Sequence, residues 1–424
     1  MMKTANIVLL SALFVVSGQA LAQTEVAGYQ CGVEREVSAG ALTERTYNRL
    51  SDIYEMIGED NYAEAYPALE SLLERNRTDE YASATILQAM AFVRAQQEQY
   101  EDAINFFKRA IDLNQLPNSQ HYQMILQVAQ LYYTIDRFSD ALDQLDIWFC
   151  VTPDEQENKV DVWVMKASIH AQIDEFREAI AAIERAIALS DEPKEQWYQL
   201  KLGMHFELEE YAAAAEVLQI LIRMNPEKKS YWVQLASVYV QLDRNRDSMA
   251  VLSLAHRKGL LDKQGEYMQL ASLQQEFDFP RKAAEVLQEG LEQGIVENTR
   301  RNWEMAGGAW YEAKELERAL DAYERAGAQS TDGKIDLQRA FILTDQERWE
   351  EAVEALSRAV ELGGLSDSQT GNAYLLLGTA LYNTGDVDGA LEAFNEATDY
   401  GRVETAAREW MNHIRNERSR RASS

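Results

Sequence analysis

The sequence predicts an all-α fold: a right-handed α-solenoid of about ten helix pairs with a C-terminal capping helix. The main observation is a short pattern that recurs every 33 to 38 residues: a small residue, three residues, a large apolar residue, two residues and then usually Ala or Leu. The small residue stands at Ala65, Ala103, Ala141, Ala179, Ala214, Ser248, Ala283, Ala319, Ala352 and Ala390. A repeat of this length is typical of stacked two-helix units and not of a closed globule.

The composition is the second observation, and it excludes several classes of function. Hydrophobic residues make up 46% of the 424 residues, enough for a continuous core, and only 6 residues are Pro. The formal net charge is −29, so nucleic acid and an anionic membrane surface would both repel the chain. The charge has two interpretations: solvated acidic helix faces, or a surface that attracts basic segments of partner proteins.

Residues 1–22 have the features of a removable signal peptide. Lys3 precedes an apolar run from Ile7 to Val16, which is too short to span a bilayer, and Ala20-Leu21-Ala22 forms a cleavage motif. An N-terminal anchor helix is the alternative. We find no other segment that resembles a membrane span. The mature protein is therefore expected to be exported, and we favour the periplasm.

Residues 23–45 lack a clear period and are expected to form an arm that carries Cys31. The second cysteine, Cys150, ends the third repeat, and an oxidising compartment permits one disulfide between the two. Ten extended residues reach roughly 33 Å, so the arm could return across two repeats. The bridge would contribute on the order of 4–5 kcal/mol in the chain-entropy model. The alternative is a buried Cys150 and a free, exposed Cys31.

The helix pairs are expected over residues 46–402, and one full repeat shows their plan. Trp163 and Ala167 share a face of its first helix, and Asp174-Glu175 interrupts the apolar pattern. The second helix carries Ala179, and Pro193 prevents its continuation. The small residues let the two helices approach closely while larger side chains fill the space around them.

Later copies repeat this plan, and the plan resembles the tetratricopeptide repeat. The family has an aromatic residue, Leu, a small residue and Tyr on the first helix, then Ala, an aromatic residue and Ala on the second. Clear copies contain Trp232, Leu235, Ala236, Tyr239, Ser248, Leu252 and Ala255; Trp303, Ala306, Gly307, Trp310, Ala319, Tyr323 and Ala326; and Tyr374, Leu377, Gly378, Leu381, Ala390, Phe394 and Ala397. The resemblance implies a scaffold for protein binding.

Residues 403–424 are expected to form the capping helix and a basic tail. Trp410 and Ile414 are four residues apart and could cover the open face of the last repeat. The tail contains Arg415, Arg418, Arg420 and Arg421. It is either a helix end whose cations suit the negative end of the helix dipole or a docking element for acidic groups.

The sequence contains no catalytic motif that we recognise. Its 5 His residues are scattered, and neither H-E-x-x-H nor G-x-S-x-G occurs. The 2 Cys residues are too few for a zinc knuckle. Gly307-Gly308 is interpreted as a close-packing position and not as part of a phosphate loop. We therefore expect no enzymatic activity, no cofactor and no metal; an enzyme would need a hidden site.

In the tetratricopeptide family the first helix of each repeat lines a groove, and the resemblance transfers those positions to this chain. The candidates are Gln88, Phe92, Gln130, Tyr133, Ser168, Ser237, Ser272, Glu304, Tyr311, Thr379 and Tyr382. Apolar, hydroxyl and amide groups dominate, which favours an extended or helical protein segment as the ligand. Alternatively, several of these side chains only pack the superhelix.

The overall plan is also similar to that of periplasmic repeat proteins associated with TonB energy-transduction systems. The shared features are a signal peptide, an N-terminal Cys-Gly (Cys31-Gly32), a long repeat array and an acidic balance. The resemblance implies a role in assembling or stabilising a TonB complex during nutrient uptake. An adaptor for outer-membrane, polysaccharide-export or cell-wall assembly is the alternative. The sequence identifies neither the partner nor the oligomeric state.

Overall fold

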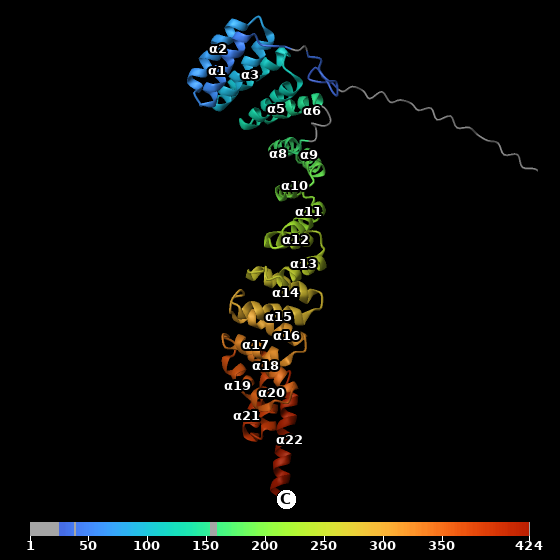
Figure 1. Cartoon of the computed structure of the whole chain (residues 1–424). Coiled ribbons are helices and arrows are strands. Elements are labelled where there is room, and N and C mark those ends of the chain that lie inside the picture. Colours follow the sequence, from blue (N-terminus) through green and yellow to red (C-terminus); the bar gives the residue numbers. More distant parts are fainter. Residues whose placement is uncertain (1–24, 38–39, 153–158, 424) are drawn as a thin grey trace, which may run out of the picture. The chain divides into compact units, whose positions relative to one another are not determined.

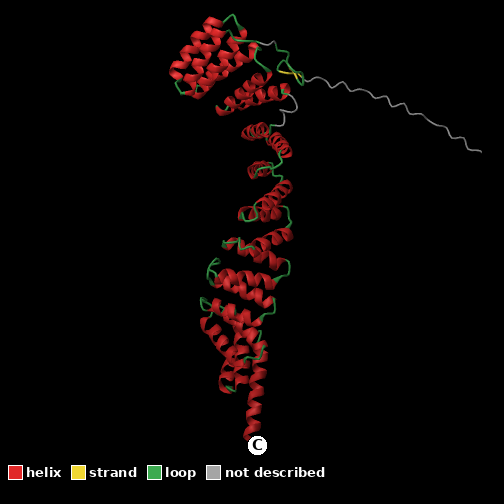
Figure 2. Ribbon diagram, viewed as in Figure 1, coloured by secondary structure: helices red, strands yellow, loops and turns green. Residues whose placement is uncertain are grey.

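The structure, a computed structural model, describes residues 25–37, 40–152 and 159–423. The expected signal peptide at 1–22 lies outside these ranges. Figures 1 and 2 show that the described chain is helical apart from one short antiparallel hairpin, β1 (Glu25–Val26) with β2 (Tyr29–Gln30). The predicted all-α solenoid is therefore confirmed. The chain divides into two compact units, with the boundary between Glu209 and Glu210.

Within each unit, consecutive helices pack on one another in chain order. The helices of unit 1 are α1 (Glu44–Gly58), α2 (Tyr62–Asn76), α3 (Glu80–Gln96), α4 (Tyr100–Leu113), α5 (Asn118–Thr134), α6 (Phe138–Val151), α8 (Val160–Gln172), α9 (Phe176–Leu189) and α10 (Glu195–Glu207). Those of unit 2 are α11 (Tyr211–Met224), α12 (Lys229–Gln241), α13 (Asn245–Arg257), α14 (Gln264–Glu276), α15 (Pro280–Glu292), α16 (Arg300–Glu312), α17 (Leu316–Gly327), α18 (Lys334–Asp345), α19 (Trp349–Leu362), α20 (Asp367–Thr384), α21 (Val387–Ala397) and α22 (Glu404–Ser423). The first helix begins at Glu44, two residues before the expected start.

The recurring small residue marks the second helix of every repeat. Each of the ten predicted positions, from Ala65 on α2 to Ala390 on α21, has an exposed fraction of 0%. A small side chain at such a position lets the two helices of a repeat approach closely. The sequence pattern therefore located a set of fully buried core positions.

A second periodic feature is the turn between the two helices of a repeat. Five residues before each small residue, one residue has a positive φ in the left-handed region, and we call it the turn residue. The turn residues are Asp60, Glu98, Asp136, Asp174, Glu209, Asp243, Asp278, Lys314, Glu347 and Gly385. The next backbone N–H then donates to a carbonyl five residues earlier, for example Gln99 to Arg94 at 2.9 Å. This geometry ends the first helix and satisfies one of its free carbonyl groups.

The N-terminal arm is fastened to the third repeat of unit 1. Cys31 and Cys150 form a disulfide across 119 residues, and the Gly32 N–H donates to the Cys150 carbonyl at 3.0 Å. Further along the arm, the Arg35 Nε donates to the Asn114 side-chain oxygen at 2.7 Å. The arm thus runs back along the repeats. Of the two alternatives from the sequence, the structure contains the disulfide and not a free Cys31.

The last helix of unit 2, α22, covers the final repeat where a capping helix is expected. The Trp410 ring stacks on Phe394 with centroids 5.6 Å apart, and Ile414 is 1% exposed. The apolar face of α21 is thereby shielded from water.

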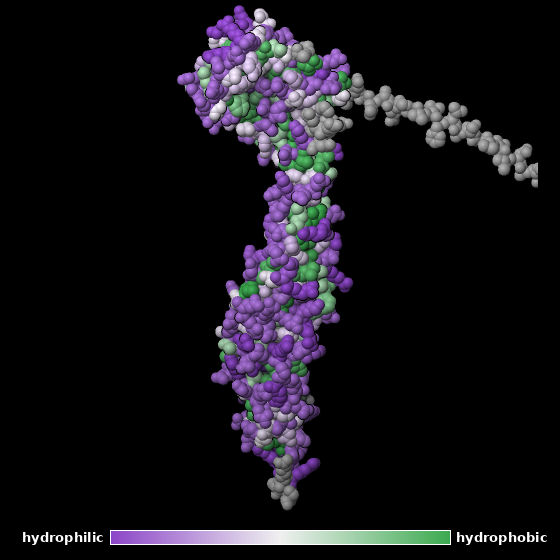
Figure 3. Space-filling view, in the orientation of Figure 1, coloured by the Kyte–Doolittle hydropathy of each residue, from purple (hydrophilic) through white to green (hydrophobic). Residues whose placement is uncertain are grey.

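Among the described residues, no helix has both the length and the apolar character needed to cross a bilayer. Figure 3 shows a mainly hydrophilic surface on the visible face, which agrees with the acidic composition.

Candidate partner-binding surface

The first helices carry a line of side chains that reach solvent. We define the first-helix row as the residue six positions before each turn residue. In unit 1 these residues are Tyr54, Phe92, Gln130, Ser168 and Gly203; in unit 2 they are Ser237, Ser272, Gly308, Phe341 and Thr379. All are exposed or half-buried. The first-helix row is therefore accessible to a ligand, whereas the small residues on the second helices are fully buried.

In unit 1 the first-helix row borders a cavity of about 280 Å³. The side chains that line it come from α1, α3, α4 and α5: Tyr54, Ile57, Gln88, Ala89, Phe92, Phe107 and Gln127. Ile57, Ala89 and Phe107 are buried and form an apolar floor, while Tyr54 is 46% and Phe92 42% exposed. Two candidates from the sequence, Gln88 and Phe92, are thus brought together in one hollow.

The polar groups of this cavity are amides and one phenol. The Gln127 Oε1 is buried and has no hydrogen-bond partner among the described residues. Burial raises the pKa of the Tyr54 hydroxyl above its ordinary value, and a phenol is already neutral at physiological pH. The cavity can therefore accept an apolar side chain.

The other unit 1 candidates do not line this cavity. Gln130 is exposed on α5, and the half-buried Tyr133 packs its ring against Phe138 with centroids 6.0 Å apart. The Ser168 hydroxyl donates to the Val164 carbonyl at 2.9 Å, so its proton is used within α8.

In unit 2, the candidates on α12, α14 and α16 remain accessible to different degrees. The Ser237 hydroxyl donates to the Val233 carbonyl at 3.0 Å, and Ser272 is exposed. Glu304 is half-buried and pairs with Arg300 at 3.9 Å, whereas Tyr311 is 43% exposed. Of these, Tyr311 offers the largest apolar contact area.

Tyr382 is half-buried, and the capping helix packs against its side chain. Its hydroxyl donates to the Glu417 carboxylate at 2.7 Å, and its ring packs against Trp410 with centroids 5.5 Å apart. The capping helix α22 therefore covers part of this side chain and occupies its hydroxyl. On the same helix, the Thr379 hydroxyl donates to the Leu375 carbonyl at 2.9 Å.

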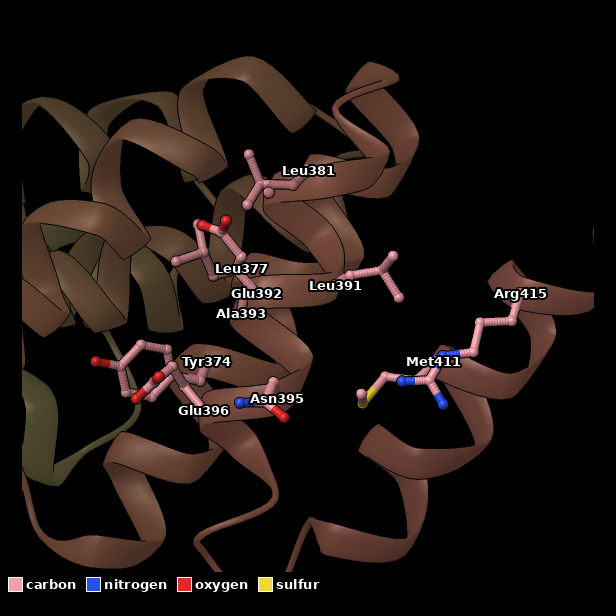
Figure 4. Close-up of a pocket in the computed structure, with 11 residues that line it drawn as sticks. Tyr374, Leu377, Leu381, Leu391, Glu392, Ala393, Asn395, Glu396, Met411 and Arg415 are labelled. Carbon is pink, nitrogen blue, oxygen red and sulfur yellow. The ribbon is translucent and has the colours of Figure 1, made fainter. Parts of the chain in front are cut away.

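A second hollow lies between α20, α21 and α22. Its volume is about 630 Å³, and Figure 4 shows Met411 and Arg415 of α22 on one side and Leu391 of α21 on the other. Glu392 and Glu396 also line it. The sequence did not predict this hollow, because it depends on how α22 docks on the final repeat.

The sequence analysis did not name Tyr54 and Gln127, which line the unit 1 cavity. It also did not name Phe341, an aromatic residue on a first helix of unit 2 that is 44% exposed. Tyr54 and Phe341 lie in the first and ninth repeats, from which no candidate was transferred, and Gln127 lies in the third repeat at a position that was not among the transferred ones. A signal was nevertheless present: Tyr54, Phe92 and Phe341 each stand eleven residues before the small residue of their repeat.

No group of three or more His, Cys, Asp or Glu side chains in the described part of the chain is placed to hold a metal ion. His170 is 9% exposed, and its Nδ1 lies 2.7 Å from the Glu175 carboxylate.

The fold and the open first-helix row define a class of protein, the helical-repeat scaffolds for protein–protein interaction. Family models described as tetratricopeptide repeat match residues 84–115, 160–193, 204–259, 268–333 and 333–401, which together are well over half of the chain. The protein belongs to the tetratricopeptide repeat family.

A curated relative and several solved structures are similar to the chain. "Uncharacterized protein ycf37" of Cyanophora paradoxa is 35% identical over 79 residues, which are 19% of this chain and 45% of that protein. The chain thus spans less than half the length of this relative. A tetratricopeptide repeat protein from Parabacteroides merdae is 11% identical, with a TM-score of 0.36 over 63% of this chain and 99% of that one. YrrB, described as a TPR protein with an unusual peptide-binding site, is 17% identical, with a TM-score of 0.34 over 47% of this chain and 100% of that one.

Proposed function

We propose that the protein is a non-enzymatic adaptor that binds a segment of a partner protein along its first helices. The observation that carries this proposal is the unit 1 cavity, where exposed Tyr54 and Phe92 flank an apolar floor. Exposed aromatic side chains beside an apolar hollow are typical of binding hot spots. An extended or helical segment fits such a surface.

The proposed compartment is the periplasm. The expected signal peptide at 1–22 supports export, and the disulfide between Cys31 and Cys150 suits an oxidising compartment.

More narrowly, we propose an accessory role in a TonB-dependent transport system, in which the adaptor assembles or stabilises the TonB complex. The support is the similarity in overall plan: the expected signal peptide, Cys31-Gly32, the long repeat array and the net charge of −29.

Photo-crosslinking in intact cells tests this function. A photoreactive residue replaces Phe92, Tyr133 or Tyr311 on the first helices, and Asn105 or Glu216, both exposed on second helices, as controls. Adducts of the first-helix positions with a TonB-type protein or its membrane partners support the proposal. Adducts with polysaccharide-export or cell-wall proteins assign the protein to envelope assembly instead. Adducts from the control positions alone would refute binding along the first helices.

A further inference from the structure

The hollow between α20, α21 and α22, which we call the α22 hollow, holds apolar side chains between charges of opposite sign. We propose that two copies of the protein associate through this hollow about a two-fold axis, so that Arg415 of each copy pairs with Glu392 and Glu396 of the other. The contact uses neither the first-helix row nor the unit 1 cavity, so it is independent of the proposed function.

The apolar part of the α22 hollow remains in contact with water. Leu377 and Ala393 are 8% and 6% exposed and form its floor, whereas Leu391 and Met411 are half-buried. Figure 4 shows Leu391 of α21 and Met411 of α22 extending toward each other across the hollow. A molecule that covers them would remove this apolar surface from water, and the flexible Met411 side chain can adapt to the contact.

The charged groups at the edges of the α22 hollow are not neutralised within the chain. Glu392 and Glu396 lie one turn apart and exposed on α21, and Arg415 is exposed on α22. None of the three forms an ion pair with another described residue, whereas Arg418 on the same face of α22 pairs with Asp388 of α21. Figure 4 shows Arg415 on the opposite side of the hollow from the two glutamates. The hollow thus has one basic and one acidic edge.

This arrangement of charges favours a second copy as the occupant. In a two-fold symmetric contact a surface meets itself turned by half a revolution, so the basic edge of each copy meets the acidic edge of the other. Arg415 then faces Glu392 and Glu396 of the other copy, and the same contact forms twice. The net charge of −29 makes two copies repel each other in general. A surface that carries both signs is therefore where two copies attract.

The contact is expected to be weak because it is small. The 11 residues that line the hollow are fewer than the roughly 20–30 residues that each partner contributes to a standard interface. We therefore expect a dissociation constant in the micromolar range, about 1–100 µM. Association would then depend on the local concentration of the protein, and a dimer could hold a partner with two binding segments more tightly than a monomer does.

Sedimentation velocity of the purified full chain, from about 1 to about 200 µM, tests the proposal. We expect a monomer–dimer equilibrium. Arg415→Glu should weaken the dimer at least about 10-fold, because like charges then face each other at both edges. Arg257→Glu is the matched control: it changes the net charge equally at an exposed position on α13 and should leave the equilibrium unchanged. Circular dichroism should show unaltered helicity in both variants, since both side chains are exposed.

Exchange of the charges is a sharper test. Glu392→Arg/Glu396→Arg should also weaken the dimer at least about 10-fold, although it reduces the net negative charge and hence the general repulsion. Its combination with Arg415→Glu should restore the dimer to within about 3-fold of the parent, because opposite charges face each other again with their signs exchanged. If the combined variant is as weak as the separate ones, the proposed pairing does not form.

A photoreactive residue in place of Asn395, which is exposed and lines the hollow, locates the contact. In a mixture of unlabelled and heavy-isotope-labelled protein, crosslinks between copies should join position 395 to residues 411–418 of the other copy. A protein that stays monomeric over the whole concentration range, or a dimer that the charge reversals leave intact, would overturn the proposal. Crosslinks in intact cells from position 395 to a different protein alone would assign the hollow to that partner instead of a second copy.

Discussion

Gly307 on α16 lies directly against the ring of Tyr323 on α17. A Cβ atom at Gly307 would lie 2.7 Å from that ring, which is closer than van der Waals contact allows. Gly378 repeats the relationship two repeats later, with a Cβ only 2.6 Å from the ring of Phe394. In both repeats, glycine on the first helix makes room for an aromatic side chain on the second.

Gly307→Ala should therefore destabilise unit 2. Tyr323 is 6% exposed, so its ring has little freedom to move aside, and overpacking of this kind typically costs about 1–3 kcal/mol. The free energy of unfolding from urea titration, followed by circular dichroism, measures the loss. An unchanged midpoint of urea unfolding would show that the Tyr323 ring can move aside to accommodate the added methyl group.

The neighbouring Gly308 provides the matched control and corrects one sequence interpretation. Gly307-Gly308 was expected to be a close-packed pair, but a Cβ at Gly308 would meet only the Tyr323 hydroxyl, at 3.8 Å. Gly308→Ala should therefore stabilise α16 by roughly 0.5–1 kcal/mol, because Ala loses less backbone entropy in a helix.

The turn residues allow a second prediction. Glu98 has a φ of 59° in the left-handed region, where a side chain costs roughly 1–2 kcal/mol and glycine does not. Glu98→Gly should raise the free energy of unfolding of unit 1 by a few tenths to about 1 kcal/mol, since the entropy of Gly offsets part of the gain. Thermal unfolding measures the change. Gly385, the one turn residue that is already Gly, is the reverse control: Gly385→Ala should destabilise unit 2 by about 1 kcal/mol.

The repeat architecture was predictable from sequence because local rules fix it. The buried small residue and the turn residue keep a constant spacing of five, so the pattern around Ala103 and Glu98 recurs throughout. Each helix pair contacts mainly its chain neighbours, and such local contacts leave a visible period in the sequence.

The candidate site was only partly predictable because it depends on distant contacts. Phe92 could be named from its repeat position, but the cavity also needs Tyr54 and Gln127 from two other helices. Tyr382 has a groove position in the repeat, yet α22 covers part of it through Glu417 and Trp410. The position of a residue within its repeat predicts the face of the helix on which its side chain lies. It does not predict which helices from elsewhere in the chain contact that side chain.

The disulfide allows a third prediction, which concerns the arm. Reduction, or the Cys31→Ser/Cys150→Ser double substitution, frees a closed loop of 119 residues, and the chain-entropy model assigns about 4–5 kcal/mol to such a closure. We expect amide hydrogen exchange to accelerate in α5 and α6, which the arm contacts, and to stay unchanged in unit 2. A reducing agent should have no further effect on the double variant. Equal protection in the oxidised and reduced proteins would contradict a stabilising role of the bridge.

His121 near the start of α5 makes the stability of unit 1 depend on pH. Its side chain is 1% exposed, and neither ring nitrogen has a hydrogen-bond partner among the described residues. Burial, with a smaller effect from the Arg35 charge, lowers its pKa from 6.5 to about 4. The rings of Tyr29 and Tyr122 pack edge-on against it at 6.5 Å and 6.2 Å and offer no counter-charge.

The sign of the effect follows from proton binding. Between about pH 6.5 and pH 4 the unfolded chain protonates His121 and the folded chain does not, so the free energy of unfolding falls as the pH is lowered through this window. The loss should be on the order of 2 kcal/mol at about pH 4.5 and absent at about pH 7.5. His121→Phe removes the proton site while keeping a ring, so the stability difference between parent and variant should shift by this amount between the two pH values. His413→Gln, at an exposed position on α22, is the control for removing a histidine elsewhere in the chain. A parent–variant difference that stays constant with pH would mean that His121 is protonated equally in the folded and unfolded chains, and the packing of the arm over a neutral imidazole would then be wrong.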